Sequence, residues 1–170
     1  MIKNNISESI LYNNILLLSR KKFFYTDFNL TDTFQNRINL IFIHFSLIFI
    51  KKNQNMKSTI YKNFYQNLFD FIFSQVEINM REIGYGDVVV NKNMKFLTKT
   101  FYSILLYCEN YRNSAKFSKK IFLNNYLEFN NKQKTLINEP LINYFNKFEA
   151  FCFDLTPDSV LKGEINFNNK

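Results

Sequence analysis

Two carboxylates frame a short turn in the middle of the chain, and they are the side chains best placed to do chemistry. Glu82 and Asp87 lie on either side of Gly84-Tyr85-Gly86. If the turn brings them face to face, they could act as a general acid and a general base. No nucleophile motif accompanies them, so we predict no catalytic residue and no enzymatic activity. The simpler role is structural, with Asp87 accepting backbone N–H groups and Glu82 pairing with Arg81 or Lys92.

Metal and cofactor chemistry has equally few candidate ligands. His44 is the only histidine and sits among apolar residues, which is typical of a core histidine whose ring nitrogens are hydrogen-bonded. Cys108 and Cys152 lie in apolar runs without metal-type spacing. We therefore expect buried, reduced thiols in a reducing compartment, and we predict no metal and no cofactor.

The turn itself draws on two of only three glycines in the sequence, Gly84 and Gly86. Glycine adopts a positive φ at no steric cost, so the pair indicates one sharply turned backbone feature. It is not a dinucleotide-binding fingerprint, because no strand precedes it and no third glycine follows at the required spacing. Two interpretations stay open: a purely structural corner between helices, or a corner that also shapes a binding surface.

The segments on both sides of the turn repeat apolar residues every three or four positions, the pattern of amphipathic helices. Ser58 is placed to cap the first and longest helix. After the turn we expect a short extended piece at Val88-Val89-Val90 and then a helix capped by Asn91 or Asn93. The apolar positions are Tyr61, Phe64, Tyr65, Leu68, Ile72, Val76, Met80 and Ile83 in the first helix, and Met94, Leu97, Phe101, Leu105 and Cys108 in the second.

Helix signals recur along the rest of the chain, whereas strand signals are weak. We predict an all-α fold in a single compact domain of about six to seven helices, divided into N-terminal helices at 1–52, a polar linker at 53–57 and a main helical part at 58–170. Residues 38–50 form the most hydrophobic run, which as a helix is too short to cross a bilayer. The candidate start signals are Ser7, Thr31-Asp32-Thr33, Ser114, Pro140 and Thr156-Pro157, and Gly163 is a stop signal.

Composition leaves the partner class open. The formal net charge is +8, and basic residues gather at 20–22 and again between 112 and 134. One interpretation is a solvated basic face, because an AT-rich coding sequence supplies lysine without any partner. The other is a surface that meets lipid headgroups or the ribosome. Aromatic residues make up 18% of the sequence, and we expect most of them to lie in the core. Any that are exposed would form a surface for a hydrophobic client.

Taken together, these segments resemble the ubiquinol–cytochrome c chaperone family over most of the chain. The middle block that carries the resemblance most clearly runs from Arg81 to Asp87 and continues through Val90 and Lys92 to Tyr107. The matching residues before it are Leu11-Tyr12, Ser19-Arg20, Phe24-Tyr25, Asp32-Thr33, Arg37 and Ile43-His44. Those in and after it include Met94-Lys95, Phe101-Tyr102, Asn125-Tyr126, Tyr144, Leu161-Lys162-Gly163 and Phe167.

The sequence departs from the family pattern at three places. Ser103-Ile104 stands where the family usually has Gly-Arg, which removes a cation. Asn36 and Asn91 stand where glycine is usual, and asparagine is the non-glycine residue that best tolerates left-handed backbone geometry. We therefore expect the backbone role to survive at the two asparagines and the arginine's role to be lost at Ile104.

The resemblance implies an assembly chaperone that binds newly made cytochrome b of the bc1 complex and performs no chemistry of its own. It also implies a ribosome or a small protein as further partners. From the basic charge we expect contact with an anionic membrane surface, and we expect no DNA partner. The expected location is cytoplasmic, peripheral at the inner face of the cytoplasmic or inner mitochondrial membrane. The residues that are candidates either for client binding or for the family's motif are Phe24, Tyr25, Asp32, Thr33, Arg37, His44, Glu82, Gly84, Tyr85, Gly86, Asp87, Lys92, Met94, Phe101, Tyr102 and Tyr107.

An alternative from another class also fits the composition. Basic and aromatic residues together suit a helical module that binds RNA or the ribosome, with an affinity that falls steeply as salt rises.

Overall fold

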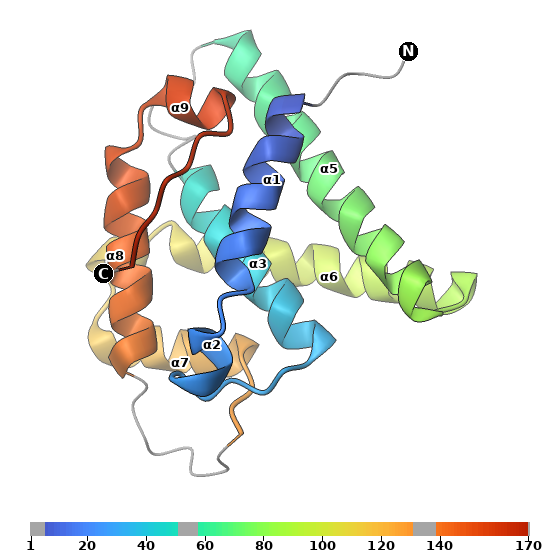
Figure 1. The fold of residues 1–170 in the computed structure, drawn as a ribbon, viewed down its shortest axis with the longest axis horizontal. Helices are drawn as coiled ribbons and strands as arrows, with labels where there is room; N and C mark the ends of the chain where they lie inside the picture. The colour runs from blue at the N-terminus through green and yellow to red at the C-terminus, as the bar shows by residue number, and fades with distance from the viewer. Residues whose placement is uncertain (1–5, 51–57, 131–138, 170) are drawn as a thin grey trace.

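A helix buried on all sides organises the structure. The computed structural model describes residues 6–50, 58–130 and 139–169. Within them, α3 (Phe34–Ile50) is buried at every position from Ile38 to Phe49. It packs against α1 (Ile6–Ser19), α6 (Asp87–Cys108) and α8 (Glu139–Asp154). Figure 1 shows α3 passing behind α1, with α8 on one side and the pair formed by α5 (Thr59–Ile83) and α6 on the other.

The remaining elements complete a helical shell around this core. They are α2 (Phe23–Thr26), α5 (Thr59–Ile83), a 3-10 turn at Tyr111–Asn113, α7 (Lys116–Tyr126) and α9 (Pro157–Leu161). In the described ranges the only β pairing is an isolated bridge between Leu30 and Phe129. The prediction of an all-α fold in one compact domain is confirmed. The predicted linker at 53–57 lies outside the described residues, and the internal division of the domain stays a prediction.

Several predicted helix ends are confirmed because their signals are local. The Ser58 hydroxyl accepts a hydrogen bond from Ile60 N–H at the start of α5, and Thr33 does the same for Asn36 N–H at the start of α3. Thr156 caps α9 with Pro157 in its first turn. Pro140 lies in the first turn of α8, as expected.

Three predicted starts are wrong. α1 is already helical at Ile6, so Ser7 is not its cap. The N-cap of α7 is Ala115, not Ser114. Residues Val88 to Val90 are helical rather than extended, because α6 begins directly at Asp87 with Gly86 as its N-cap. In a first turn there is no preceding turn for β-branched side chains to crowd, and Asp87 there complements the helix dipole.

Polar side chains on α3 fasten the segment that follows α7. The Asn36 amide donates to the carbonyls of Thr31 and Glu128, both at 2.7 Å, and its oxygen accepts from Glu128 N–H at 2.8 Å. Asn39 donates to the Tyr126 carbonyl. The expectation of a left-handed backbone at Asn36 and Asn91 is wrong, because both lie within helices and Asn29 alone has a positive φ among the described non-glycine residues.

The third glycine is the most tightly packed. Gly163 has a φ of +72°, and a β-carbon placed there would lie 2.7 Å from the Ser7 carbonyl oxygen and 2.8 Å from the Leu11 nitrogen. The close approach lets the chain after α9 run back along α1 and α8 (Figure 1), where Ile165 is buried and Phe167 contacts Phe148. None of the described helices combines the length and hydropathy that a bilayer span requires.

Candidate functional site

The corner between α5 and α6 projects from the body of the protein, at the far right of Figure 1. α5 ends in a Schellman motif, in which Tyr85 N–H donates to the Met80 carbonyl and Gly84 N–H to the Arg81 carbonyl. Gly84 adopts the left-handed conformation with a φ of +102°. Gly86 has a φ of −73°, which any residue can adopt. The glycine pair therefore does form one sharp corner, but only Gly84 needs to be glycine.

One arginine ties the two sides of the corner together. Arg81 Nε and Nη2 donate to the Glu77 carboxylate at 3.1 and 2.9 Å, and Nη1 donates to Asp87 at the start of α6. These bonds to two carboxylates raise the pKa of the Arg81 guanidinium. The predicted pairing of Glu82 with Arg81 is wrong, because Arg81 turns to Glu77 and Asp87 instead. The Glu77–Arg81 pair has the i, i+4 spacing that could have revealed it in the sequence.

The apolar side chains at this corner are exposed. Val88 is 83% exposed, Ile83 55%, Val89 48% and Tyr85 38%. We call these four residues the apolar tip. Exposed apolar side chains on a projecting corner contribute little to the protein's own core, which makes this group a candidate surface for an apolar partner.

Tyr85 connects the tip to the start of α3. Its ring meets that of Phe34 edge-on, with centroids 6.5 Å apart. Near Phe34, Arg37 forms a two-pronged ion pair with Asp32 at 2.7 and 2.9 Å, which lowers the pKa of the Asp32 carboxyl and raises that of the guanidinium. Three predicted residues, Asp32, Thr33 and Arg37, thus gather at the entry to α3.

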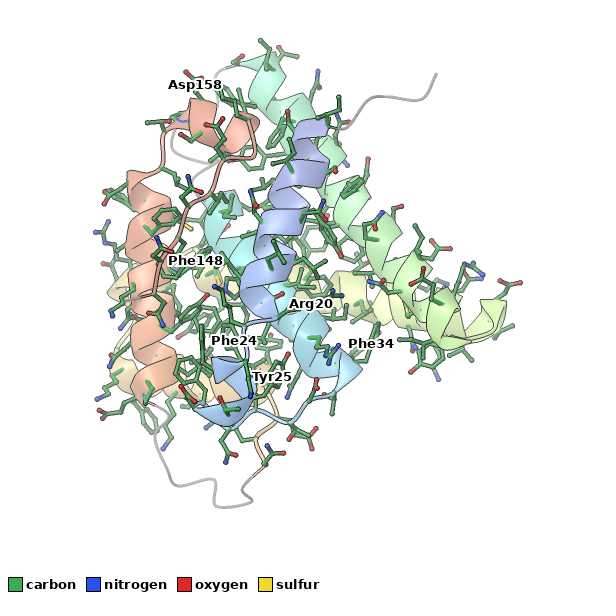
Figure 2. The ribbon with its side chains drawn as sticks, in the orientation of Figure 1. Arg20, Phe24, Tyr25, Phe34, Phe148 and Asp158 are labelled. Atoms are coloured by element: carbon green, nitrogen blue, oxygen red, sulfur yellow. The ribbon has the colours of Figure 1, made fainter. Side chains whose placement is uncertain are left out.

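Other predicted residues lie in the core, away from the tip. Phe24 on α2 is fully buried, and its ring meets those of Phe28, His44 and Tyr144. Figure 2 shows Phe24 on the side of α2 that faces α8, where Phe148 lies. Tyr25 is half-buried, and burial raises the pKa of its hydroxyl.

His44 is a core histidine, as the sequence indicated. Its side chain is fully buried, with Nδ1 2.6 Å from the Leu40 carbonyl and Nε2 2.8 Å from the Tyr144 hydroxyl. A carbonyl can only accept, so Nδ1 carries the proton and Nε2 accepts from Tyr144. Burial lowers the pKa of His44 to about 4, so the ring is neutral near pH 7. Since Glu82 and Asp87 are exposed, no shared pocket unites the three groups.

The predicted residues on α6 divide between its two faces. Phe101 is fully buried and belongs to the core, whereas the neighbouring Tyr102 is 55% exposed. Met94 is half-buried against the core, and Lys92 is exposed. Tyr107 stacks on Phe122 with centroids 4.0 Å apart. The prediction that Phe101 contacts a partner is therefore wrong, because its position on the helix points the side chain into the core.

The position that differs from the family pattern also faces inward. Ile104 is fully buried, so no side chain at this position lies at the tip. Ser103 beside it is exposed and shares a hydrogen bond of 2.7 Å with the Tyr126 hydroxyl. The described residues contain no group of three histidines, cysteines or acids that could hold a metal ion.

Comparison with known proteins supplies a family. The family model described as ubiquinol-cytochrome C chaperone matches residues 26–121, which is more than half of the chain. A solved structure described as the crystal structure of the Cbp3 homolog from Brucella abortus matches with a TM-score of 0.80 and 21% identity. The match covers 98% of this chain and 91% of that one, and at this identity it shows a shared fold. The search of curated proteins returns no match.

The two glycines of the corner should differ in how they respond to substitution. Gly84→Ala places a β-carbon at positive φ and should lower the free energy of unfolding by about 1–2 kcal/mol. In Gly86→Ala the added β-carbon meets nothing within 4 Å. Alanine caps a helix less well than glycine but also lowers the entropy of the unfolded chain, so the two effects should offset each other and the free energy of unfolding should change little. Urea unfolding measures both variants, and equal losses would contradict the corner geometry.

Burial of His44 predicts a pH dependence of stability. The pKa is 6.5 when the ring is exposed and about 4 in the fold, so the unfolded chain binds the extra proton first as pH falls. Stability is fully present above pH 6.5 and declines by about 3 kcal/mol as pH falls towards 4, at roughly 1.4 kcal/mol per pH unit.

Urea unfolding between pH 4 and 7.5 checks this dependence. The control is the double variant His44→Phe with Tyr144→Phe, which removes both hydrogen-bonding partners together. Its stability should change less over the same interval, because the buried imidazole is gone. Identical pH profiles for the two proteins would show that His44 is not a buried neutral group.

Proposed function

The chain belongs to the ubiquinol–cytochrome c chaperone family, and from that premise we propose that its apolar tip binds newly made cytochrome b. The family places the protein among the factors that support assembly of the bc1 complex, with no catalytic step required. Binding at the tip would shield apolar segments of the client until its other subunits and haem arrive.

The observation that carries this proposal is the exposure of the tip on a projecting corner. Ile83, Val88 and Val89 lie outside the buried core, and Tyr85 contacts its edge through Phe34, yet burying an isoleucine or valine side chain is worth roughly 2 kcal/mol. Three such residues together with Tyr85 provide enough free energy to hold an apolar segment reversibly. The Arg81 ion pairs and the Schellman motif keep the tip in one conformation, which reduces the entropic cost of binding.

The location follows from the client. Cytochrome b is a membrane protein, so a chaperone that receives it works peripherally at the inner face of the cytoplasmic or inner mitochondrial membrane. The ribosome and a small partner protein fit the same setting, because they would hold the chaperone where the client emerges.

A variant with a charged tip should support less assembly of the bc1 complex although the protein still folds. In cells that make the bc1 complex but lack this protein, we expect the double variant Val88→Asp with Val89→Asp to restore several-fold less b-type haem absorbance than the unchanged chain. Aspartate suits the first turn of a helix, so the melting temperature should change by no more than a few degrees.

The control adds one exposed carboxylate elsewhere. Leu17 on α1 is 66% exposed, and Leu17→Asp should restore assembly fully. Full assembly by the folded tip variant would refute the tip as the client surface. Equal failure of both variants would mean that any added acid is harmful, which also removes the support for the tip.

A further inference from the structure

The outward face of α6, beyond the tip, combines basic and apolar side chains. Lys92, Lys95 and Lys99 recur on it at helical spacing, and between Val88 and Cys108 the sequence contains no acidic residue. Between the lysines, Phe96 is 59% exposed, and further along Leu106 is 68% exposed. We call these five side chains the lysine face of α6.

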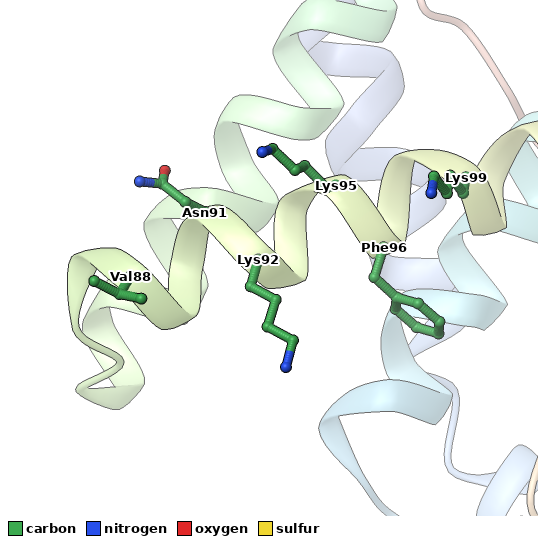
Figure 3. A pocket seen from close by; sticks show the side chains of 6 residues that line it. All are labelled: Val88, Asn91, Lys92, Lys95, Phe96 and Lys99. Atoms are coloured by element: carbon green, nitrogen blue, oxygen red, sulfur yellow. The ribbon is translucent and has the colours of Figure 1, made fainter.

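The close-up view shows how the side chains of this face are arranged. In Figure 3, Lys92 and Phe96 project from the same side of α6, and Lys95 projects from the opposite edge. The open surface among them is bordered by Val88, Asn91, Lys92, Lys95, Phe96 and Lys99. All of these lining residues come from one helix, so the surface is convex and open rather than an enclosed pocket.

The core does not need this face. The opposite side of α6 supplies Leu97, Phe101, Ile104 and Cys108 to the core, all of them buried. The exposed aromatic ring of Phe96 and the uncompensated lysines are therefore surplus to folding.

Three described residues of the basic segment between 112 and 134 are by contrast engaged within the protein. Lys116 forms an ion pair with Glu139. Lys119 is buried, donates to Asn146 at 2.9 Å and lies 4.5 Å from the centre of the Tyr111 ring. Arg112 lies over the Phe153 ring. On α6, none of the three lysines forms an ion pair with any residue of the described ranges.

We propose that the lysine face of α6 docks onto the anionic lipid headgroups of a membrane. The three ammonium groups would meet lipid phosphates while Phe96 and Leu106 enter the interface between headgroups and acyl chains. This inference deepens the proposed function and rests on it, because docking along α6 would hold the apolar tip at the membrane surface where a membrane-protein client lies.

The chemistry of the face favours lipid over nucleic acid. Lysine is a compact point charge that suits a fluid array of phosphates, whereas arginine provides the fork that is preferred for fixed nucleic-acid contacts. α6 has no arginine after Asp87. A convex helix surface also fits a flat bilayer better than it fits a single strand, which is usually held in a groove.

Vesicle sedimentation with the full chain tests the docking without any client. We expect binding to vesicles that contain phosphatidylglycerol and little binding to pure phosphatidylcholine. The triple variant Lys92→Gln, Lys95→Gln and Lys99→Gln should bind the anionic vesicles on the order of 100-fold more weakly, since each lysine near the surface is worth about 1 kcal/mol, a factor of about five. Phe96→Ala should weaken binding several-fold with no loss of stability.

The control removes the same charge from another place. Arg20, Lys21 and Lys22 are exposed at the junction of α1 and α2 (Arg20 is labelled in Figure 2), and changing all three to Gln should leave binding nearly unchanged. Equal losses in the two triple variants would show that only net charge matters, which overturns the assignment to α6. Absence of binding to anionic vesicles would overturn it as well.

Two further outcomes separate the competing explanations. If the unchanged chain does not bind vesicles but binds RNA in a salt-dependent way that needs the α6 lysines, the lysine face is a nucleic-acid surface and the lipid proposal is wrong. If vesicle binding follows the prediction while the tip variant assembles the bc1 complex normally, the docking stands and the client surface fails. The two proposals can therefore fail separately.

Discussion

The burial of α3 on every side is the constraint on which the rest of the structure depends. Between Ile38 and Phe49 the helix has no solvent-facing side, so a polar side chain there must find its partner inside the protein or cost about 1–3 kcal/mol. The Ser46 hydroxyl is the exception, because it has no hydrogen-bond partner among the described residues. His44 meets this requirement with Leu40 and Tyr144, and Asn36 with the backbone of Thr31 and Glu128. These pairs fix where α8 and the segment after α7 lie against α3. The polar groups thus specify an arrangement that apolar packing alone would leave less defined.

The same constraint divides α6 into two faces. One face must cover α3, and it supplies fully buried residues such as Phe101 and Ile104. The other face has no partner in the described part of the fold and is free to carry lysines and exposed apolar residues. At the N-terminal end of α6 the Gly84 turn carries the helix pair beyond the body, so the tip stands clear of the core (Figure 1). The buried face of α6, the apolar tip and the lysine face therefore all follow from the packing of one side of α6 against α3.

Sequence reasoning succeeded where the signals were local and failed where they were not. Ser58, Thr33 and Thr156 could be identified as caps because a cap acts within three residues of its own position. The valines after Gly86 were predicted to be extended because intrinsic preference ignores the first-turn position that makes them acceptable in a helix. The burial of His44 could be expected, but its partner Tyr144 lies a hundred residues away and no spacing rule connects them. Phe101 lies on the apolar stripe that the sequence predicts for α6, so its burial could have been predicted. The exposed neighbour Tyr102 was the better candidate for a contact with a partner.

Site-specific photocrosslinking most directly tests whether the tip is the client surface. A photoreactive residue at Val88, in cells that make cytochrome b, should capture it, and the same residue at Leu17 should not. A crosslinked product that contains cytochrome b should form from position 88 alone. Capture from position 17 but not from position 88, or from neither, would contradict the claim that the corner between α5 and α6 receives the client.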